Sequence, residues 1–372
     1  MNEMTSAFPG LSTRPGIEAL RHAGVRAAML LITLLAPVAD ADVLTVGPIL
    51  ASDGEIISGT LIVPESDDEG ASIPITIVNG AEPGPVVAFI AGIHGYEYAP
   101  VVALQRIRAE IDPSVLRGTV IIVHVANPAS FYGRTIYYNP VDGMNLNRAF
   151  PGDPYGSHSE RIAHALTTEV IERADFVVDM HAGDGNEALR PFIYMPEVGD
   201  TELDAGSRRL ALAFGLDHIV IDRSPLRDAD DSLYVDQTAL TRGIPGITTE
   251  TGQLGSTDER WVEMAVQGVW GVLVDLDMLD GERREDNAVV WLEDYEVITS
   301  PADGMFRAEV LDGYAVAENG RLGALVNLFG DEIAVIRSPF AGVVNYVLGT
   351  PPVKEGEPLA MVSRVAEDGA RR

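Results

Sequence analysis

Two uninterrupted apolar runs constrain the fold of this chain more than any other feature. Pro85–Ala91 and Thr119–Ala126 consist almost entirely of Val, Ile, Ala and Phe. Continuous rather than alternating hydrophobicity is typical of strands buried on both faces, as in a parallel sheet covered by helices. The segment between them, Pro100–Ile111, has helical spacing of its apolar residues. The pattern predicts a strand, a helix and a second strand in succession.

The same alternation continues along the chain. Short strand-like stretches come first, at Val43–Val46, Glu55–Val63 and Ile73–Val78. Further strands are expected at Asp175–Met180, Ile219–Ile221 and Gly246–Thr249, and further helices at about Ser159–Glu172, Glu202–Phe214 and Asp258–Leu279. Strands that alternate with helices predict an α/β fold, with a mostly parallel or mixed sheet flanked by helices.

The C-terminal part has a different pattern. A composition shift near 281–287 indicates a linker, so we expect one domain at 42–286 and a small all-β domain at 287–372. Ser300–Gly304 and Ser338–Gly342 form a faint internal repeat, which resembles the two halves of a biotinyl/lipoyl-like β-sandwich. That family carries its cofactor on a lysine at a hairpin tip. No lysine stands at the corresponding tip, Leu328–Glu332, which favours a structural role or a place at the rim of the active site.

The N-terminus resembles an export signal. Arg21 and Arg26 precede the apolar run Ala27–Val38, and Ala-Asp-Ala follows at 39–41. A positive segment, a short apolar segment and small residues at a cleavage site are typical of a signal peptide. We expect residues 1–41 to direct the protein to the periplasm or outside the cell, leaving no membrane span in the mature chain. An uncleaved anchor or a buried helix is the alternative.

Charge and cysteine content exclude several functions. The 372 residues include 26 Lys and Arg against 56 Asp and Glu, a formal net charge of −30. A nucleic-acid partner is excluded, because binding to phosphates begins with a basic face. The chain has no cysteine, so a transition-metal site must use histidines and carboxylates. The composition predicts no particular oligomeric state.

Two histidines stand out by their position. His94 and His181 each follow the end of an apolar run, in loops that small residues open. The carboxyl ends of parallel strands share one edge of a sheet, where ligand sites collect, so these two side chains can converge. By contrast, His124 lies within an expected strand and fits the core, and helix-associated His158 and His164 are expected at the surface.

A carboxylate accompanies the first histidine. Glu97 follows His94 by three residues, and Gly95 allows the backbone to bend between them. Two His and one Glu around Zn²⁺, with a fourth position for water, form a known catalytic arrangement. Since His181 and Asp184 show the same spacing, the spacing alone does not identify the site.

Other polar residues complete the candidate site. Glu250 ends a short β-rich run and is expected at the same sheet edge, where it can act as a base, although a surface glutamate is the alternative. The loop Asp142–Gly152 holds several amides and Arg148, and Arg134 stands upstream. A guanidinium binds a carboxylate through two hydrogen bonds, but arginines in a turn are often simply solvated.

Taken in order, the motifs resemble a known family. They are His94–Glu97, Asn127–Ala129, Asn145–Gly152, Asp179–His181 and the run that ends in Glu250. They resemble the succinylglutamate desuccinylase/aspartoacylase family, in its bacterial predicted-deacylase branch, within the zinc carboxypeptidase (M14) superfamily. The resemblance extends from about Gly59 to Leu279 and implies a zinc carboxypeptidase-like fold.

The resemblance also implies roles for individual residues. One zinc ion per chain is expected on His94, Glu97 and His181, with Glu250 as general base and acid. Substrate contacts are expected from Asn147 and Arg148, which would hold a carboxylate, and from Arg134, which would polarise the scissile carbonyl.

One position departs from the family pattern. The carboxypeptidases and aspartoacylase have aspartate two residues before the asparagine of the Asn-Arg pair, where it supports a zinc-binding histidine. This chain has Asn145 there, and a neutral amide raises the basicity of His94 less. Asp179 precedes His181 by two residues, hence on the same strand face, and it can support that histidine or cap the loop.

These observations favour an exported zinc-dependent amidohydrolase, a deacylase that removes the acyl group from a small N-acylated amino acid or related carboxylate-bearing amide. An M14-type carboxypeptidase acting on short peptides is the nearest alternative, since the same centre serves both reactions. A non-catalytic protein that binds zinc or a small molecule is the alternative from another class. Glu250 argues against it, because binding alone requires no base there.

Overall fold

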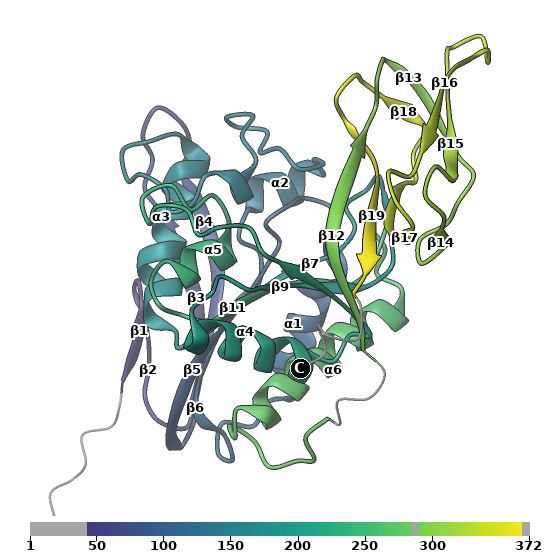
Figure 1. Ribbon diagram of the computed structural model, residues 1–372. Coiled ribbons are helices and arrows are strands. Elements are labelled where there is room, and N and C mark those ends of the chain that lie inside the picture. Colours follow the sequence, from purple (N-terminus) through teal and green to yellow (C-terminus); the bar gives the residue numbers. More distant parts are fainter. Residues whose placement is uncertain (1–42, 285–288, 367–372) are drawn as a thin grey trace, which may run out of the picture. The chain divides into compact units, whose positions relative to one another are not determined.

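The computed structural model describes residues 43–284 and 289–366 (Figure 1). The expected export signal at 1–41 lies outside the described residues, as does part of the expected linker at 281–287. Within the two described ranges, no helix has the length and hydropathy needed to cross a membrane.

The centre of the fold is a set of four parallel strands. β5 (Glu82–Ala91) lies between β6 (Arg117–Val123) and β7 (Phe176–His181), and β11 (Gly246–Glu250) pairs with β7. All neighbouring pairs among them are parallel. The two continuous apolar runs, Pro85–Ala91 and Thr119–Ala126, therefore belong to adjacent strands. The carboxyl ends of these strands lie at one edge of the sheet.

Antiparallel strands extend the sheet on both sides, so the predicted mixed sheet is confirmed. β4 (Ala71–Asn79) pairs antiparallel with β6, and β3 (Glu55–Val63) pairs with β4. On the other side β9 (Phe192–Pro196) runs antiparallel to β11, and β10 (His218–Asp222) runs parallel to β9. β9 was not expected from the sequence, because its apolar run, Phe192–Met195, is only four residues long and is bounded by prolines.

Helices cover both faces of the sheet (Figure 1). α1 (Tyr98–Glu110), α4 (Thr201–Phe214) and α6 (Glu259–Asp275) pack on one face, and α3 (His158–Glu169) and α5 (Val235–Leu240) on the other. β5 shows the division. Val87 and Phe89 enter one hydrophobic core and Ala88 and Ile90 enter the other, as the two-residue period of a strand requires.

Local signals set the helix ends. Ser157 and Glu160 form a capping box at the start of α3, and Gly215 ends α4 in the left-handed conformation with φ 80°. The sequence predicted that the last helix would reach Leu279. It ends at Asp275 instead, and Asp277 adopts a φ of 60°, which a continuing helix does not allow.

The C-terminal region is all-β, as predicted. β12 (Val290–Thr299) pairs in parallel with β10, so the large sheet continues into this region through β19 (Pro358–Val365), β17 (Gly342–Leu348) and β14 (Ala315–Val316). A second sheet contains β16 (Glu332–Arg337), β15 (Arg321–Val326), β13 (Gly304–Ala308) and β18 (Pro352–Val353).

The internal repeat has a structural counterpart. The Ser300 hydroxyl donates to the carbonyl of Ala302 at 2.8 Å, and the Ser338 hydroxyl donates to the carbonyl of Phe340 at 2.6 Å. The two Ser-Pro segments thus form equivalent turns. The predicted tip, Leu328–Glu332, lies at the hairpin between β15 and β16.

Two further short strands lie outside the sequence prediction. β1 (Leu44–Val46), expected from the sequence, pairs with the unexpected β2 (Ile49–Ala51). β8 (Glu187–Leu189) pairs antiparallel with β17, with Glu187 opposite Leu348. This pairing joins the C-terminal region to the loop that follows β7.

One prediction about the histidines is confirmed and another is wrong. His124 is buried just past the end of β6, and its Nε2 lies 2.8 Å from the Thr76 hydroxyl, which confirms a core histidine. The surface prediction for His158 is wrong. Its ring is buried, where Nδ1 lies 2.8 Å from the Asn139 amide and Nε2 lies 2.8 Å from the Gly70 carbonyl.

Burial of His124 predicts a pH dependence of stability. Burial lowers the pKa of His124 to about 4, whereas an unfolded histidine titrates near 6.5. Between these values the unfolded chain binds a proton that the folded chain does not, so stability falls as the pH falls. Between pH 7 and pH 5, the wild type should lose about 2 kcal/mol more unfolding free energy than a His124→Gln variant.

Urea unfolding at the two pH values measures this difference. A His164→Gln variant is the control, since His164 is only partly buried, and it should follow the wild type. Identical pH dependence of the wild type and the His124→Gln variant would contradict the prediction.

Candidate active site

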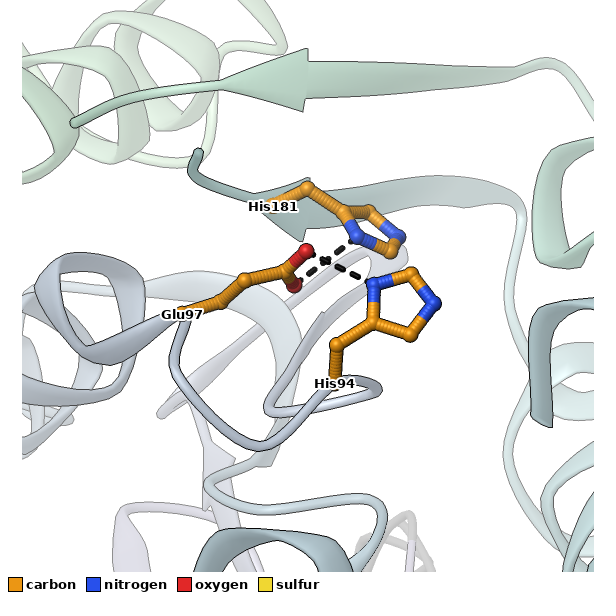
Figure 2. Close-up of side chains that lie close together, drawn as sticks. All are labelled: His94, Glu97 and His181. Carbon is orange, nitrogen blue, oxygen red and sulfur yellow. Dashed lines mark hydrogen bonds and ion pairs between the residues drawn. The ribbon is translucent and has the colours of Figure 1, made fainter. Parts of the chain in front are cut away.

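Two imidazoles and one carboxylate converge at the carboxyl edge of the sheet (Figure 2). His94 and Glu97 lie on the loop between β5 and α1, and His181 is the last residue of β7 rather than a loop residue. Glu97 Oε1 lies 2.7 Å from His94 Nδ1, and Glu97 Oε2 lies 2.9 Å from His181 Nδ1. The three ligand atoms all lie within 4.8 Å of one another.

Both imidazoles turn the same nitrogen toward the centre. His94 Nε2 lies 3.1 Å from Asn145 Oδ1, and His181 Nε2 lies 2.9 Å from Asp179 Oδ2. In a neutral ring with its proton on Nε2, that proton is donated to these oxygens and the Nδ1 lone pair can bind a metal ion. Asn145 and Asp179 thus lie where supporting residues are expected, and for Asp179 the contact favours support of His181 over a loop cap.

Burial and charge suit this trio to a divalent cation. The exposed fractions are 9% for His94 and 3% each for Glu97 and His181. Burial raises the pKa of Glu97, but the two imidazoles outweigh it and hold that pKa at about 2. Burial likewise lowers the pKa of both histidines, yet nearby carboxylates, Glu97 among them, raise each above its ordinary value. An ionised carboxylate and two imidazoles are a donor set that zinc favours.

Gly95 is required for the shape of the ligand loop. Its backbone N–H donates to the carbonyl of Thr135 at 3.2 Å. A Cβ atom at this position would lie 2.3 Å from the Ser130 carbonyl oxygen and 2.5 Å from that of Thr135. The loop between His94 and Glu97 can therefore lie this close to its neighbour only with glycine at 95.

Glu250 lies beside the trio. It is the last residue of β11 and stands opposite His181 in the parallel pairing of β11 with β7. Its Oε2 is buried, with no hydrogen-bond partner among the described residues. Burial raises the pKa of Glu250 well above its usual range, although the nearby His181 lowers it. A carboxyl group in such a place can take up and release a proton.

The Asn-Arg pair lies next to these residues. Asn147 Nδ2 lies 3.3 Å from Asp179 Oδ2 and 3.2 Å from His181 Nε2, and its Oδ1 accepts from the Val235 backbone. Asn147 therefore contacts the support of His181, while its predicted contact with substrate stays a prediction. Arg148 is exposed, and its guanidinium stacks 4.5 Å from the centre of the Tyr234 ring.

Arg134 follows α2 (Pro128–Gly133) in the left-handed conformation, with φ 52°. It is exposed, and it directly precedes Thr135, which contacts the ligand loop. In the described part of the chain, its guanidinium makes no hydrogen bond or ion pair. It is therefore available to a substrate.

Sequence reasoning missed Tyr137 and Glu187 near the candidate ligands and named Asp184 only through its spacing from His181. Asp184 is fully buried and accepts hydrogen bonds from the backbone of Tyr137 at 2.9 Å and of Gly185 at 2.7 Å. Glu187 accepts from the Tyr137 hydroxyl at 2.8 Å. Burial raises the pKa of Asp184 to about 7. The spacing from His181 pointed to Asp184, but the metal-ligand group does not include it.

Two tyrosines border the acidic groups of the site. Burial, together with Glu250, Tyr346 and Glu187, raises the pKa of Tyr194 well above its ordinary value. Tyr346 is 9% exposed and comes from β17 in the C-terminal region. Burial and the Glu187 carboxylate raise its pKa too, so both hydroxyls stay neutral. The C-terminal region thus supplies a side chain beside the site.

Comparison with known proteins identifies the family. Residues 83–275 match the model of the succinylglutamate desuccinylase/aspartoacylase catalytic domain. The chain belongs to this family. The matched region contains all three candidate metal ligands and Glu250. It ends close to the expected limit at Leu279 but begins 24 residues after the expected limit at Gly59.

Relatives extend over most of the chain. The N-alpha-acetyl-L-2,4-diaminobutyric acid deacetylase of Halomonas elongata is 28% identical over 320 residues, which are 83% of this chain and 92% of that protein. The product-bound ectoine utilization protein EutE (DoeB) from Ruegeria pomeroyi is 28% identical, with a TM-score of 0.76. The match covers 86% of this chain and all of that one.

A succinylglutamate desuccinylase from a Silicibacter species is 27% identical, with the same TM-score of 0.76, and the match covers 87% of this chain and all of that one. The family and these relatives identify the protein as a hydrolase of the deacylase group, whose members act on small acylated amino acids.

The contact between Asp179 and His181 predicts an effect on metal binding. An Asp179→Asn variant keeps the size of the side chain but removes the charge that accepts the Nε2 proton of His181. Its zinc affinity should fall about 10- to 100-fold, measured by competition with a chelating dye. Exposed Asp230 provides the matched Asp230→Asn control. Unchanged affinity in the Asp179→Asn variant would show that Asp179 does not support this ligand.

Proposed function

We propose that the protein is a zinc-dependent hydrolase that cleaves the amide bond of a small N-acylated amino acid or related carboxylate-bearing amide. The observation that carries the proposal is the buried convergence of His94 Nδ1, His181 Nδ1 and the Glu97 carboxylate beside Glu250. A deacetylase among the relatives supports the reaction class.

Zinc would be held by His94, Glu97 and His181, and when bound it supplies the Lewis acidity that makes water a sufficient nucleophile near neutral pH. Glu250 then acts as the base that removes the proton from the attacking water. It returns this proton to the leaving nitrogen as the carbon–nitrogen bond breaks, so the products are a carboxylic acid and an amine.

The two arginines bind different groups of the substrate. Arg148, fixed by its stacking on Tyr234, binds the substrate carboxylate through paired hydrogen bonds. Arg134 has no partner in the described part of the chain and stabilises the negative charge that develops on the carbonyl oxygen. Asn147 keeps Asp179 and His181 in place and adds polarity next to the carboxylate site.

We propose that the enzyme prefers compact substrates to peptides. The pairing of β17 with β8 places the C-terminal region, with Tyr346, beside the acidic side chains of the site. A wall at this position favours a small amide over the extended chain that a carboxypeptidase must admit. The carboxypeptidase reaction therefore stays the second candidate.

Further parts of the proposal rest on the sequence pattern alone. We propose that residues 1–41 direct export to the periplasm or the outside, and that the catalytic domain ends near residue 286. Proteolysis and mass analysis of the exported protein address both points.

Glu250 provides the sharpest test of the mechanism. A Glu250→Gln variant keeps the size of the side chain but has no basic oxygen to remove the proton of water. We expect kcat to fall about 10²- to 10⁴-fold, with one zinc ion per chain retained in elemental analysis. The exposed Glu202→Gln variant is the control. Normal turnover by Glu250→Gln would rule out this mechanism.

A substrate panel separates the candidate functions. N-acetyl amino acids, N-acetyl-diaminobutyrate among them, should be hydrolysed with kcat/KM values at least about tenfold higher than dipeptides and longer peptides. A preference for peptides would favour the carboxypeptidase. Stoichiometric zinc without hydrolysis of any amide would favour a binding protein.

A further inference from the structure

We propose that Tyr137 is a positioning residue that holds the Arg134 segment against the metal ligands and acts on the reaction through Arg134. The inference rests on the proposed function, in which Arg134 stabilises charge on the carbonyl oxygen. It adds a residue that neither the family motifs nor the candidate metal ligands include.

Tyr137 is bound at both ends to the loop that follows His181. Its backbone N–H donates to Asp184 Oδ2 at 2.9 Å. Its hydroxyl lies 2.8 Å from Glu187 Oε1 and 3.1 Å from Asn186 Oδ1. The hydroxyl has one proton, and the shorter contact, with the Glu187 carboxyl oxygen, is the stronger hydrogen bond. Main chain and side chain of Tyr137 thus contact the same short segment, 184–187.

The ring of Tyr137 also contacts a metal ligand. It meets the His94 imidazole edge-on, with 5.9 Å between the ring centres and 89° between the planes. Such an arrangement fixes the plane of the imidazole from the side. Tyr137 therefore lies between the two sequence segments that carry the histidine ligands.

The N–H groups of Arg134 and Thr135 donate to carbonyls of α2, and the segment 134–137 has two further attachments, to the two loops next to the candidate ligands. At Thr135, the carbonyl accepts the N–H of Gly95, in the loop that holds His94 and Glu97. At Tyr137, the contacts reach the loop that follows His181. Arg134 directly precedes the first of these attachments, so its position depends on both of them as well as on its bond to α2.

The backbone of this segment needs such attachments. Arg134 has φ 52° and Tyr137 has φ 58°, both in the left-handed region that side chains other than glycine rarely adopt. A conformation of this kind persists only where its surroundings hold it. Weakening one attachment should therefore let the segment relax and displace Arg134.

The anchor for Tyr137 is itself well fixed. The Glu187 side chain accepts the backbone N–H of Asp184 at 3.1 Å, and its carbonyl accepts the N–H of Leu254 at 2.9 Å. Glu187 also pairs with Leu348 of β17. The acceptor for the Tyr137 hydroxyl is thus tied to the loop that follows Glu250 and to the C-terminal region.

Hydrogen exchange tests whether Tyr137 holds the segment. A Tyr137→Phe variant keeps the ring against His94 but has no hydroxyl for Glu187. We expect the backbone amides of 135–137 to exchange at least about tenfold faster than in the wild type, with or without zinc. Tyr138→Phe is the matched control, because Tyr138 is 57% exposed. Unchanged exchange in Tyr137→Phe would overturn the proposal whatever the enzyme's activity.

Kinetics test whether the effect passes through Arg134. For the best substrate, Tyr137→Phe should lower kcat about 5- to 50-fold and change KM less than about twofold. The reason is that a displaced Arg134 stabilises the charge of the transition state less well. In an Arg134→Gln background, the same substitution should have no further effect on kcat. A residue that only stabilises the fold would lower kcat by the same factor in both backgrounds, and that result would overturn the proposal.

The two readouts separate this inference from the proposed function. If Arg134→Gln alone retains full kcat, the role of Arg134 in the proposed function is wrong, and Tyr137 has no effect to transmit through it. If the wild type hydrolyses no amide, the proposed function is wrong. Hydrogen exchange still tests the role of Tyr137: faster exchange in Tyr137→Phe supports it, and unchanged exchange overturns it.

Discussion

The rest of the structure depends on the approach of two imidazole nitrogens to a single buried carboxylate. His94 Nδ1 and His181 Nδ1 meet the two oxygens of Glu97 at 2.7 and 2.9 Å. Taking a carboxylate out of water is costly unless positive charge or hydrogen bonds compensate for it. The histidines provide this compensation for Glu97, and the zinc ion that we propose would provide it for all three side chains. The loop and the strand end that carry these three side chains must therefore keep them within a few ångströms of one another.

The parallel sheet makes this approach possible. β5 and β7 are neighbours, so the loop after one and the last residue of the other lie at the same edge. The two-residue period of β7 places Asp179 on the same face as His181, behind the imidazole. Register with β11 then brings Glu250 opposite His181. The relative positions of the proposed ligand His181, its proposed support Asp179 and the proposed base Glu250 thus follow from strand order and register.

Much of this could be predicted from the sequence, because its strongest signals are periodic and local. The buried runs identified β5 and β6, and the positions of His94 and His181 at the ends of apolar runs predicted their convergence. β9 could not be found, since a short apolar run between prolines carries no clear period. His158 was assigned to the surface because its partners, Asn139 and Gly70, come from distant segments.

The contacts of the surrounding loops were also beyond sequence reasoning. Tyr137 and Glu187 are 50 residues apart, and nothing in their own neighbourhoods indicates that they meet. Loop geometry depends on tertiary contacts such as the close approach at Gly95. The glycine there was expected to allow a bend, and the structure adds that it also allows two chain segments to touch.

Anomalous scattering at the zinc absorption edge tests the central claim most directly. In crystals of the zinc-loaded protein, the account predicts one strong anomalous peak per chain. This peak should lie about 2.0–2.2 Å from Nδ1 of His94, Nδ1 of His181 and the carboxylate of Glu97. Zinc-loaded crystals with no peak among these three side chains, or with the strong peak elsewhere, would contradict it.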